Sequence, residues 1–243
     1  SIDGTGTASI IYGIQTSTST VVNNGNTISN LTCLKTSGTS ALYGIYNIAS
    51  ATNENYNYNQ IDSLEHFGTG TTYGLYSFTT TGIRTMSFNT IHSISTNGNT
   101  AIGLLSSSSA PSIFNNKIYN IEAKGTAATT CFGISVTSTG TANNASIYNN
   151  IIGDLRAPNS SVTAANTAPQ VRGINFTATT ATTTVNISFN TVHLDASSGG
   201  TNFGSTALYV TTRATATTAA LTLRNNLLVN NSTYSATART ITY

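Results

Sequence analysis

Short apolar phrases alternate with polar stretches along the whole chain and recur at a nearly fixed interval. The first phrase is an apolar residue, a glycine and a branched apolar residue, as in Tyr43-Gly44-Ile45. Its central glycines, which are 31, 30, 29, 30 and 40 residues apart in turn, are Gly13, Gly44, Gly74, Gly103, Gly133 and Gly173. Two degenerate copies, identified by a preceding Thr-Ala pair, are Leu208-Tyr209-Val210 and Arg239-Thr240-Ile241. Such a period indicates stacked coils or an array of units.

A second phrase runs in step with the first and consists of an asparagine, any residue, and then Ile, Val or Leu. Its asparagines are Asn26, Asn59, Asn89, Asn116, Asn150, Asn190 and Asn226. In most copies another apolar residue stands three places before the asparagine. Each repeat therefore holds two short segments of alternating apolar residues, separated by Thr, Ser, Gly and Asn. This pattern is typical of strands and turns.

The composition narrows the choice among repeat architectures. Of the 243 residues only 7% are charged, there is no Trp, and no stretch of good helix formers is long enough for a helix. Helical solenoids are thereby excluded. We predict an all-β fold, a single-stranded parallel β-helix with about seven rungs of three short strands each. Residues 1–243 are expected to form one elongated domain without capping helices.

In such a solenoid, equivalent positions stack at the strand spacing of about 4.8 Å, so each column of the repeat becomes a ladder in space. One inward column is predicted to hold Ile14, Ile45, Leu75, Leu104, Ile134, Ile174, Val210 and Ile241. A second is predicted to hold Met86, Ile113, Ile147, Ile187 and Leu223 together with Ile61, Ile91, Ile118, Ile152 and Val192. The asparagines are expected to form an amide ladder at a repeated corner, because Asn tolerates left-handed backbone. The glycines mark a place where a side chain would crowd the bend or the next rung.

The architecture resembles the right-handed parallel β-helix of pectate lyases, tailspikes and many large bacterial surface proteins. The Asn-x-Ile phrase with a following Ser93-Ile94 or Asn120-Ile121, and the Tyr-Gly-Ile strand after a Gly/Thr-rich turn, resemble the repeats of giant surface proteins of Bacteroidetes-type bacteria. That resemblance implies a right-handed coil, export by a type IX system, and a role as adhesin, stalk or gliding-related filament. We expect the chain to be a segment of a longer protein, with end-to-end stacking of coils into a filament as the alternative.

The distribution of charged and apolar residues argues against nucleic acids and membranes as partners. The formal net charge is +2, and the nine basic residues are scattered along the sequence. Nucleic-acid binders concentrate Lys and Arg on one face, so no nucleic-acid partner is expected. No long apolar span or basic and apolar leader is present, which argues against membrane insertion. The expected location is extracellular or on the cell surface, and the expected partners are a surface glycan or neighbouring copies stacked end to end.

Candidate catalytic and metal-binding residues do not converge in the sequence. Cys33 and Cys131 are predicted to be buried free thiols about three rungs apart. His92 and His193 share one repeat position, but Tyr119 and Gly153 occupy that position in the rungs between them, so one metal ion cannot bridge them. No cofactor, metal or catalytic residue is therefore predicted.

Two carboxylates on neighbouring rungs are the other candidates for catalysis. Glu122 and Asp154 fall on neighbouring rungs, but Arg156 lies directly across from Glu122. This arrangement predicts an exposed ion pair across rungs. Convergence of the acids in a deep groove would instead favour an enzyme.

Two rungs are longer than the rest and are predicted to carry loops that project side by side. The insertions span about 156–170 and 196–205, and their candidate recognition residues are Asn159, Ser160, Asn202 and Phe203. The segment after each glycine strand is rich in Thr and Ser, as in 79–81, 137–141 and 211–218. That face could serve solubility, contact with a polysaccharide, or ice binding.

The predicted function is a non-enzymatic, structural or adhesive β-helix module of a bacterial surface protein or filament. One alternative is a polysaccharide-binding or polysaccharide-processing β-helix, similar to lyases and glycosidases. A second alternative is an ice-binding solenoid.

Overall fold

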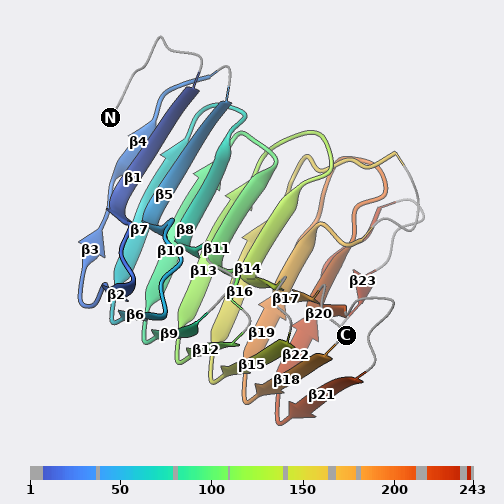
Figure 1. Ribbon diagram of the computed structural model, residues 1–243. Coiled ribbons are helices and arrows are strands. Elements are labelled where there is room, and N and C mark those ends of the chain that lie inside the picture. Colours follow the sequence, from blue (N-terminus) through green and yellow to red (C-terminus); the bar gives the residue numbers. More distant parts are fainter. Residues whose placement is uncertain are drawn as a thin grey trace.

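Figure 1 shows the computed structural model, in which successive coils of the chain lie side by side in sequence order. The structure describes residues 8–36, 39–78, 82–108, 110–138, 142–163, 168–178, 182–211, 218–235 and 240–241. These residues form strands and turns and contain no helix, and all strand pairs are parallel. The predicted all-β parallel solenoid is confirmed. Each coil contributes strands to three sheets, which we call the first, second and third sheet in the order in which a coil passes through them.

The first sheet has eight strands and contains the glycine phrase. Its strands are β1 (Ala8–Thr16), β5 (Thr39–Asn47), β8 (Thr71–Ser77), β11 (Thr100–Ser106), β14 (Thr130–Ser138), β17 (Val171–Ala178), β20 (Ser205–Thr211) and β23 (Thr240–Ile241).

The second sheet has seven strands and leads into the asparagine. Its strands are β2 (Thr20–Val22), β6 (Asn53–Asn57), β9 (Ile83–Ser87), β12 (Ala110–Phe114), β15 (Ala142–Tyr148), β18 (Thr182–Ser188) and β21 (Thr218–Arg224).

The third sheet follows the asparagine. Its strands are β3 (Thr27–Ile28), β4 (Leu31–Cys33), β7 (Gln60–His66), β10 (Thr90–Thr96), β13 (Lys117–Ala123), β16 (Ile151–Arg156), β19 (Thr191–Leu194) and β22 (Leu227–Asn230).

Left-handed residues bend the coils at two repeated places, the first in all seven coils and the second in five of them. One is the residue directly before each ladder asparagine, and in the seven coils these are Gly25, Tyr58, Phe88, Asn115, Asn149, Phe189 and Asn225. The expectation that the ladder asparagine itself takes the left-handed conformation is therefore wrong. The second place is inside the third sheet, at Asn30, Ser63, Ser93, Asn120 and Asp154. There the bend lets residues three apart, such as Ile91 and Ile94, both face the core.

The core consists of columns of apolar side chains, in which each side chain is aligned with its counterpart in the next coil. Ile45, Leu75 and Leu104 are aligned in the first sheet, and all three are fully buried. The residues of the second predicted column form two separate columns in the structure. Met86 and Ile113 lie in the second sheet, whereas Ile91 lies across the asparagine corner in the third. Leu223, in the last described strand of the second sheet, is largely exposed.

The register corrects the sequence alignment near the C-terminus. Ile174 pairs with Leu208, so Leu208 and not Val210 continues the inward column, and Val210 pairs with Phe176. Ile241 pairs with Thr206, which lies in the outward column. The Thr-Ala pair that was used to align the degenerate copies gave the wrong register. Ala207 is aligned with Gly173, whereas the sequence alignment placed it before the glycine position. Arg239, from the last degenerate copy, lies outside the described residues.

The asparagines form a continuous hydrogen-bonded ladder at the corner between the second and third sheets. The Nδ2 of each of the first six donates to the Oδ1 of the asparagine in the next coil at 2.9–3.0 Å. The backbone N–H of the same residue donates to the same oxygen. The second Nδ2 proton reaches a backbone carbonyl of the preceding coil, as Asn116 does with Met86 at 2.9 Å. Each inner side chain thereby uses its full bonding capacity.

The glycines of the first sheet stand where no side chain fits. A Cβ on Gly74 would lie 2.5 Å from the carbonyl oxygen of Gly103 and 2.6 Å from Cγ2 of Ile91 across the core. The other glycines of the phrase, Gly13, Gly44, Gly103, Gly133 and Gly173, meet the same two obstacles. The glycine column therefore lets the core isoleucines of the third sheet approach the backbone of the first sheet.

Replacing Asn116 by Ala should destabilise the coil strongly. The substitution leaves the buried N–H of Asn89 and the carbonyl of Met86 without their partners. Each unsatisfied buried group costs about 1–3 kcal/mol, so we expect the free energy of unfolding to fall by about 3 kcal/mol. Urea denaturation followed by circular dichroism measures this. Asn144→Ala, at an exposed position of β15, serves as control and should change stability by less than about 0.5 kcal/mol; equal effects of the two would contradict the ladder's role.

Candidate functional site

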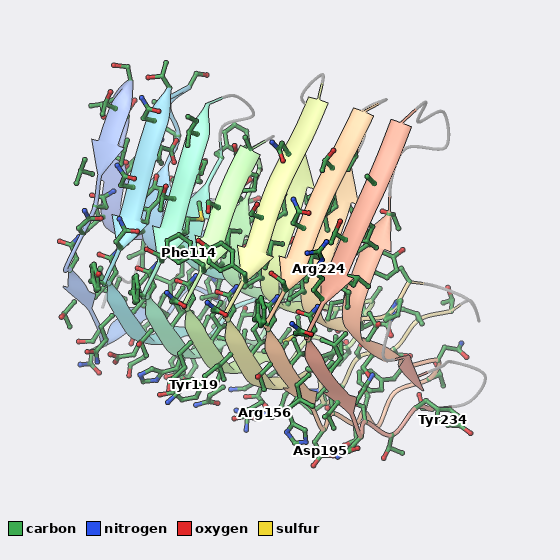
Figure 2. All side chains as sticks on the ribbon, turned by 90° about the horizontal axis from the view of Figure 1, so that it is seen from below. Phe114, Tyr119, Arg156, Asp195, Arg224 and Tyr234 are labelled. Carbon is green, nitrogen blue, oxygen red and sulfur yellow. The ribbon has the colours of Figure 1, made fainter. Side chains whose placement is uncertain are left out.

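Most of the exposed charged side chains of the described residues lie on the strands of the third sheet or directly after them. Five of the seven carboxylates lie on its strands or directly after them, namely Asp62, Glu65, Glu122, Asp154 and Asp195. Figure 2 shows Tyr119, Arg156 and Asp195 following one another along this side of the rod. Acidic and basic groups alternate there, so the third sheet presents a mixed, solvated surface.

The predicted ion pair across rungs is confirmed on this face. Arg156 pairs in register with Glu122, and its Nε lies 3.9 Å from Glu122 and 3.6 Å from Asp154. Lys124 also approaches Glu122, at 3.6 Å. These side chains are a quarter to a half exposed. Exposed pairs of this kind contribute at most about 1 kcal/mol, and the acids are held by cations on an outer surface.

The two histidines of the shared repeat position lie in one column, with Tyr119 and Gly153 between them. His92 stacks on Tyr119 with ring centroids 4.8 Å apart. Within the described residues, no group of three or more His, Cys, Asp or Glu side chains could hold a metal ion.

Both cysteines are buried and free, as predicted. Burial raises the pKa of the Cys131 thiol to about 12, and its Sγ lies 3.4 Å from the carbonyl oxygen of Ile121. Such a thiol is not ionised near neutral pH and acts as a small apolar side chain.

His66 is a buried polar residue of the third sheet. It pairs in register with Cys33 and points inward at the end of β7. The Gly68 N–H donates to its Nδ1 at 2.9 Å, which places the ring proton on Nε2. In the described part of the chain, neither this Nε2 nor the nearby Oγ of Ser40 has a hydrogen-bond partner. The absent side chain of Gly70 leaves room between them, since a Cβ there would lie 2.6 Å from each atom.

A buried ion pair lies between the first and second sheets and was missed entirely. Glu54 and Arg84 face inward on neighbouring strands β6 and β9, are fully buried, and approach to 3.0 Å. Tyr56 and Ser77 each donate to the Glu54 carboxylate at 2.6 Å, and Asn47 donates at 2.7 Å. Burial lowers the pKa of Arg84, although Glu54 opposes that shift. Glu54 stands two residues before the buried Tyr56, and Arg84 stands two residues before the buried Met86. Because alternate residues of a strand face the same side, this spacing could have predicted that both charges face inward.

The described residues of the two insertions, 156–163, 168–170 and 196–205, lie side by side and form hydrogen bonds with each other and with neighbouring coils. Val162 donates to the carbonyl of Thr201 at 3.0 Å, and Ser161 and Thr201 share a hydroxyl contact of 2.8 Å. Ser160 and Phe203 are fully buried, so the prediction that they project for recognition is wrong. Their burial fills the space that the longer coils enclose.

Asn159 is exposed and Asn202 is half-buried, and they donate to the backbone carbonyls of Lys124 and Val162 respectively. The amides that were expected to contact a ligand therefore help to attach the loops to neighbouring coils.

Of the Thr/Ser-rich segments that follow the glycine strands, residues 79–81, 139–141 and 212–217 lie outside the described residues.

Stacked aromatic rings cover the outer face of the first sheet. Tyr12, Tyr43 and Tyr73 follow one another at centroid distances of 5.2 Å, and Tyr46 stacks on Tyr43 at 4.6 Å. Further along the same face the Arg172 guanidinium lies 3.8 Å from the centroid of the Tyr209 ring. The tyrosines are half-buried against one another, so they reinforce the stack of coils.

A second set of rings, which we call the corner stripe, runs along the asparagine corner on the outside. It consists of Tyr58, Phe88, Phe114, Tyr148 and Phe189. Tyr58 stacks on Phe88 and Phe114 stacks on Tyr148, each at 4.8 Å, and Phe88 meets Phe114 edge-on at 5.9 Å. Figure 2 labels Phe114 within this row and Arg224 beyond it. Next to Phe189 is a hollow of about 290 Å³ lined by Asn186, Ser188, Thr222 and Arg224.

Comparison of the chain with protein-family models, with curated proteins and with solved structures found no match. No helix in the described part of the chain is long and apolar enough to cross a bilayer.

Replacing Arg84 by Met should destabilise the protein by about 3–5 kcal/mol, because it leaves the Glu54 carboxylate buried without its cation. The double variant Glu54→Gln, Arg84→Met removes both charges and keeps an amide oxygen for Tyr56 and Ser77. It should recover part of the loss. Urea denaturation of the four proteins of this cycle measures the coupling, and an Arg84→Met protein as stable as the parent would contradict it.

Acid should destabilise the protein through His66. Burial lowers the pKa of this histidine in the folded protein below its ordinary value of 6.5. As the pH falls through about 6.5, His66 therefore becomes protonated in the unfolded chain while it stays neutral in the folded chain. The free energy of unfolding decreases as a result. His66→Thr, which copies Thr96 of the next coil, should flatten this dependence, whereas His193→Thr should retain it. Urea denaturation at pH 8, 6.5 and 5 tests this; identical profiles for both variants would disprove it.

Proposed function

We propose that the chain is a non-enzymatic, structural and adhesive module of an extracellular bacterial surface protein or filament. The observation that carries the proposal is the asparagine ladder, whose six consecutive links join all seven coils between Asn26 and Asn226. A chain built on such a ladder is a rigid spacer, because every coil is fixed to its neighbours by side-chain and backbone hydrogen bonds alike.

The state of the carboxylates supports a non-enzymatic role. Glu122 and Asp154 are held by Arg156 on an exposed face, and Glu54 is enclosed with Arg84. An acid and base pair for polysaccharide cleavage needs two carboxylates that flank a bound sugar. These residues are engaged in ion pairs instead, which favours a structural over a lyase-like or glycosidase-like function.

The extracellular location is proposed from the resemblance of the repeats to type IX-exported surface proteins and from the composition. The chain is rich in hydroxyl and amide side chains and only 7% charged.

The two ends of the ladder are complementary, which supports stacking on a neighbouring coil. Among the described residues, the Oδ1 of Asn26 accepts no hydrogen bond. At the other end, Asn226 uses its Nδ2 for the carbonyl of Ile187 and retains further donors. A coil from a neighbouring domain or copy could therefore extend the ladder in either direction, as a head-to-tail contact does.

Surface exposure and inertness can be tested together. An antibody against the chain should label intact cells of the source bacterium as strongly as permeabilised cells, and external protease should remove the label. The purified protein should release no reducing ends or unsaturated sugars from a panel of neutral and acidic polysaccharides. Label that appears only after permeabilisation would disprove the location, and product release above a boiled control would disprove the non-enzymatic role.

A further inference from the structure

The corner stripe places large side chains where the backbone disfavours them. Tyr58, Phe88 and Phe189 adopt φ values of 59°, 55° and 57°, a left-handed conformation that is uncommon for bulky residues. The equivalent residues of other coils are Gly25, Asn115, Asn149 and Asn225, which are the types that tolerate it. The local fold therefore favours Gly or Asn in all seven coils, yet three coils carry a ring.

The three rings of Tyr58, Phe88 and Phe189 are 65%, 43% and 55% exposed, so burial in the core does not offset this strain. The ring contacts of Tyr58 and Phe88 are with other members of the stripe. Where the left-handed residue is Asn115 or Asn149, the residue before it supplies the ring instead, as Phe114 or Tyr148. Five successive coils thus each place one aromatic ring on the same outer edge of the rod.

We propose that the corner stripe binds a neutral polysaccharide that runs parallel to the axis of the rod. This inference rests on the proposed adhesive function and names its surface and ligand class. Rings repeat along the stripe once per coil, that is every 4.8 Å or so, a spacing comparable to the length of one sugar unit in an extended chain. The apolar faces of successive sugars could then pack on successive rings.

Polar groups beside the rings suit the hydroxyls of such a polymer. The amides of Asn57, Asn115 and Asn149 follow the same corner, and the hollow beside Phe189 adds hydroxyls and the Arg224 guanidinium. Among the left-handed corner residues of the described coils and the residues directly before them, Arg224 in the seventh coil is the only charged one. This favours a neutral polymer over a nucleic acid, which requires a row of Lys and Arg.

A protein partner fits the geometry less well. Protein interfaces concentrate their binding energy in a central cluster of anchors that a rim shields from water. The corner stripe is instead a line one ring wide, with each ring repeated in the next coil, as recognition of a repeating ligand requires.

The sequence itself provides the variant that tests the proposal. Tyr58→Asn, Phe88→Asn and Phe189→Asn together install the residue that other coils use at this position. Binding is measured by affinity electrophoresis in gels with hydroxyethyl cellulose, laminarin or galactomannan, and by pull-down on cellulose and chitin, with alginate and gelatin as acidic and protein probes. We expect the parent to bind at least one neutral polysaccharide, and the triple variant to lose about tenfold or more in affinity. Its thermal midpoint should stay equal or rise, because the left-handed positions are relieved.

A matched control removes exposed apolar groups elsewhere on the rod. Ile48→Asn with Phe78→Asn changes two exposed residues that follow the first sheet, and this variant should bind as the parent does. Three results would each overturn the proposal: no binding of the parent to any neutral polysaccharide, unchanged binding of the triple variant, or a fall of several degrees in its thermal midpoint. Binding to gelatin alone would identify a protein surface instead. None of these results would alter the surface labelling of intact cells, so the proposed structural role is tested separately.

Discussion

The whole architecture depends on the hydrogen bonds that join each corner asparagine to the next. A parallel coil can be extended only if every coil bends at the same residue, and the asparagine ladder fixes that residue in seven coils at once. The bend in turn sets which residues of the second and third sheets face inward. The isoleucines of the third sheet then press against the first sheet, where only glycine leaves enough space. Amide ladder, apolar columns and glycine column are therefore one interdependent construction.

Sequence reasoning succeeded where a residue type is dictated by its column. Gly74 and Asn116 belong to columns that hold the same residue type in six and seven successive coils, so their spacing sufficed to predict a parallel solenoid. It failed where the column is occupied by unlike residues. Val210 was assigned to the column of Ile174 because a Thr-Ala pair was taken as a marker, whereas Leu208 occupies that column and Val210 pairs with Phe176. Glu54, Arg84 and His66 were missed because burial of a polar group is decided by partners from other coils, which are remote in sequence.

The candidate binding surface illustrates the same division. The sequence pointed to the long coils, since extra residues suggest loops that project. In the structure Ser160 and Phe203 are buried, and Phe203 is part of the core. The stripe of rings instead lies at the asparagine corner, on coils of ordinary length at Tyr58, Phe88 and Phe114 and on the two long coils at Tyr148 and Phe189. No period reveals them, because Phe88 and Phe114 occupy different sequence positions relative to the asparagine and meet only in three dimensions.

The buried pair of Glu54 and Arg84 has a consequence for how a nearly periodic sequence finds one arrangement. Because the coils resemble one another, the second sheet could slip by a whole coil during folding and still bury apolar columns. In such an out-of-register arrangement Arg84 would lie against a coil that offers no carboxylate, and two unneutralised charges would remain inside. The ion pair therefore fixes which two coils must be neighbours. It also restricts which coils can be duplicated or deleted when repeats recombine in the gene.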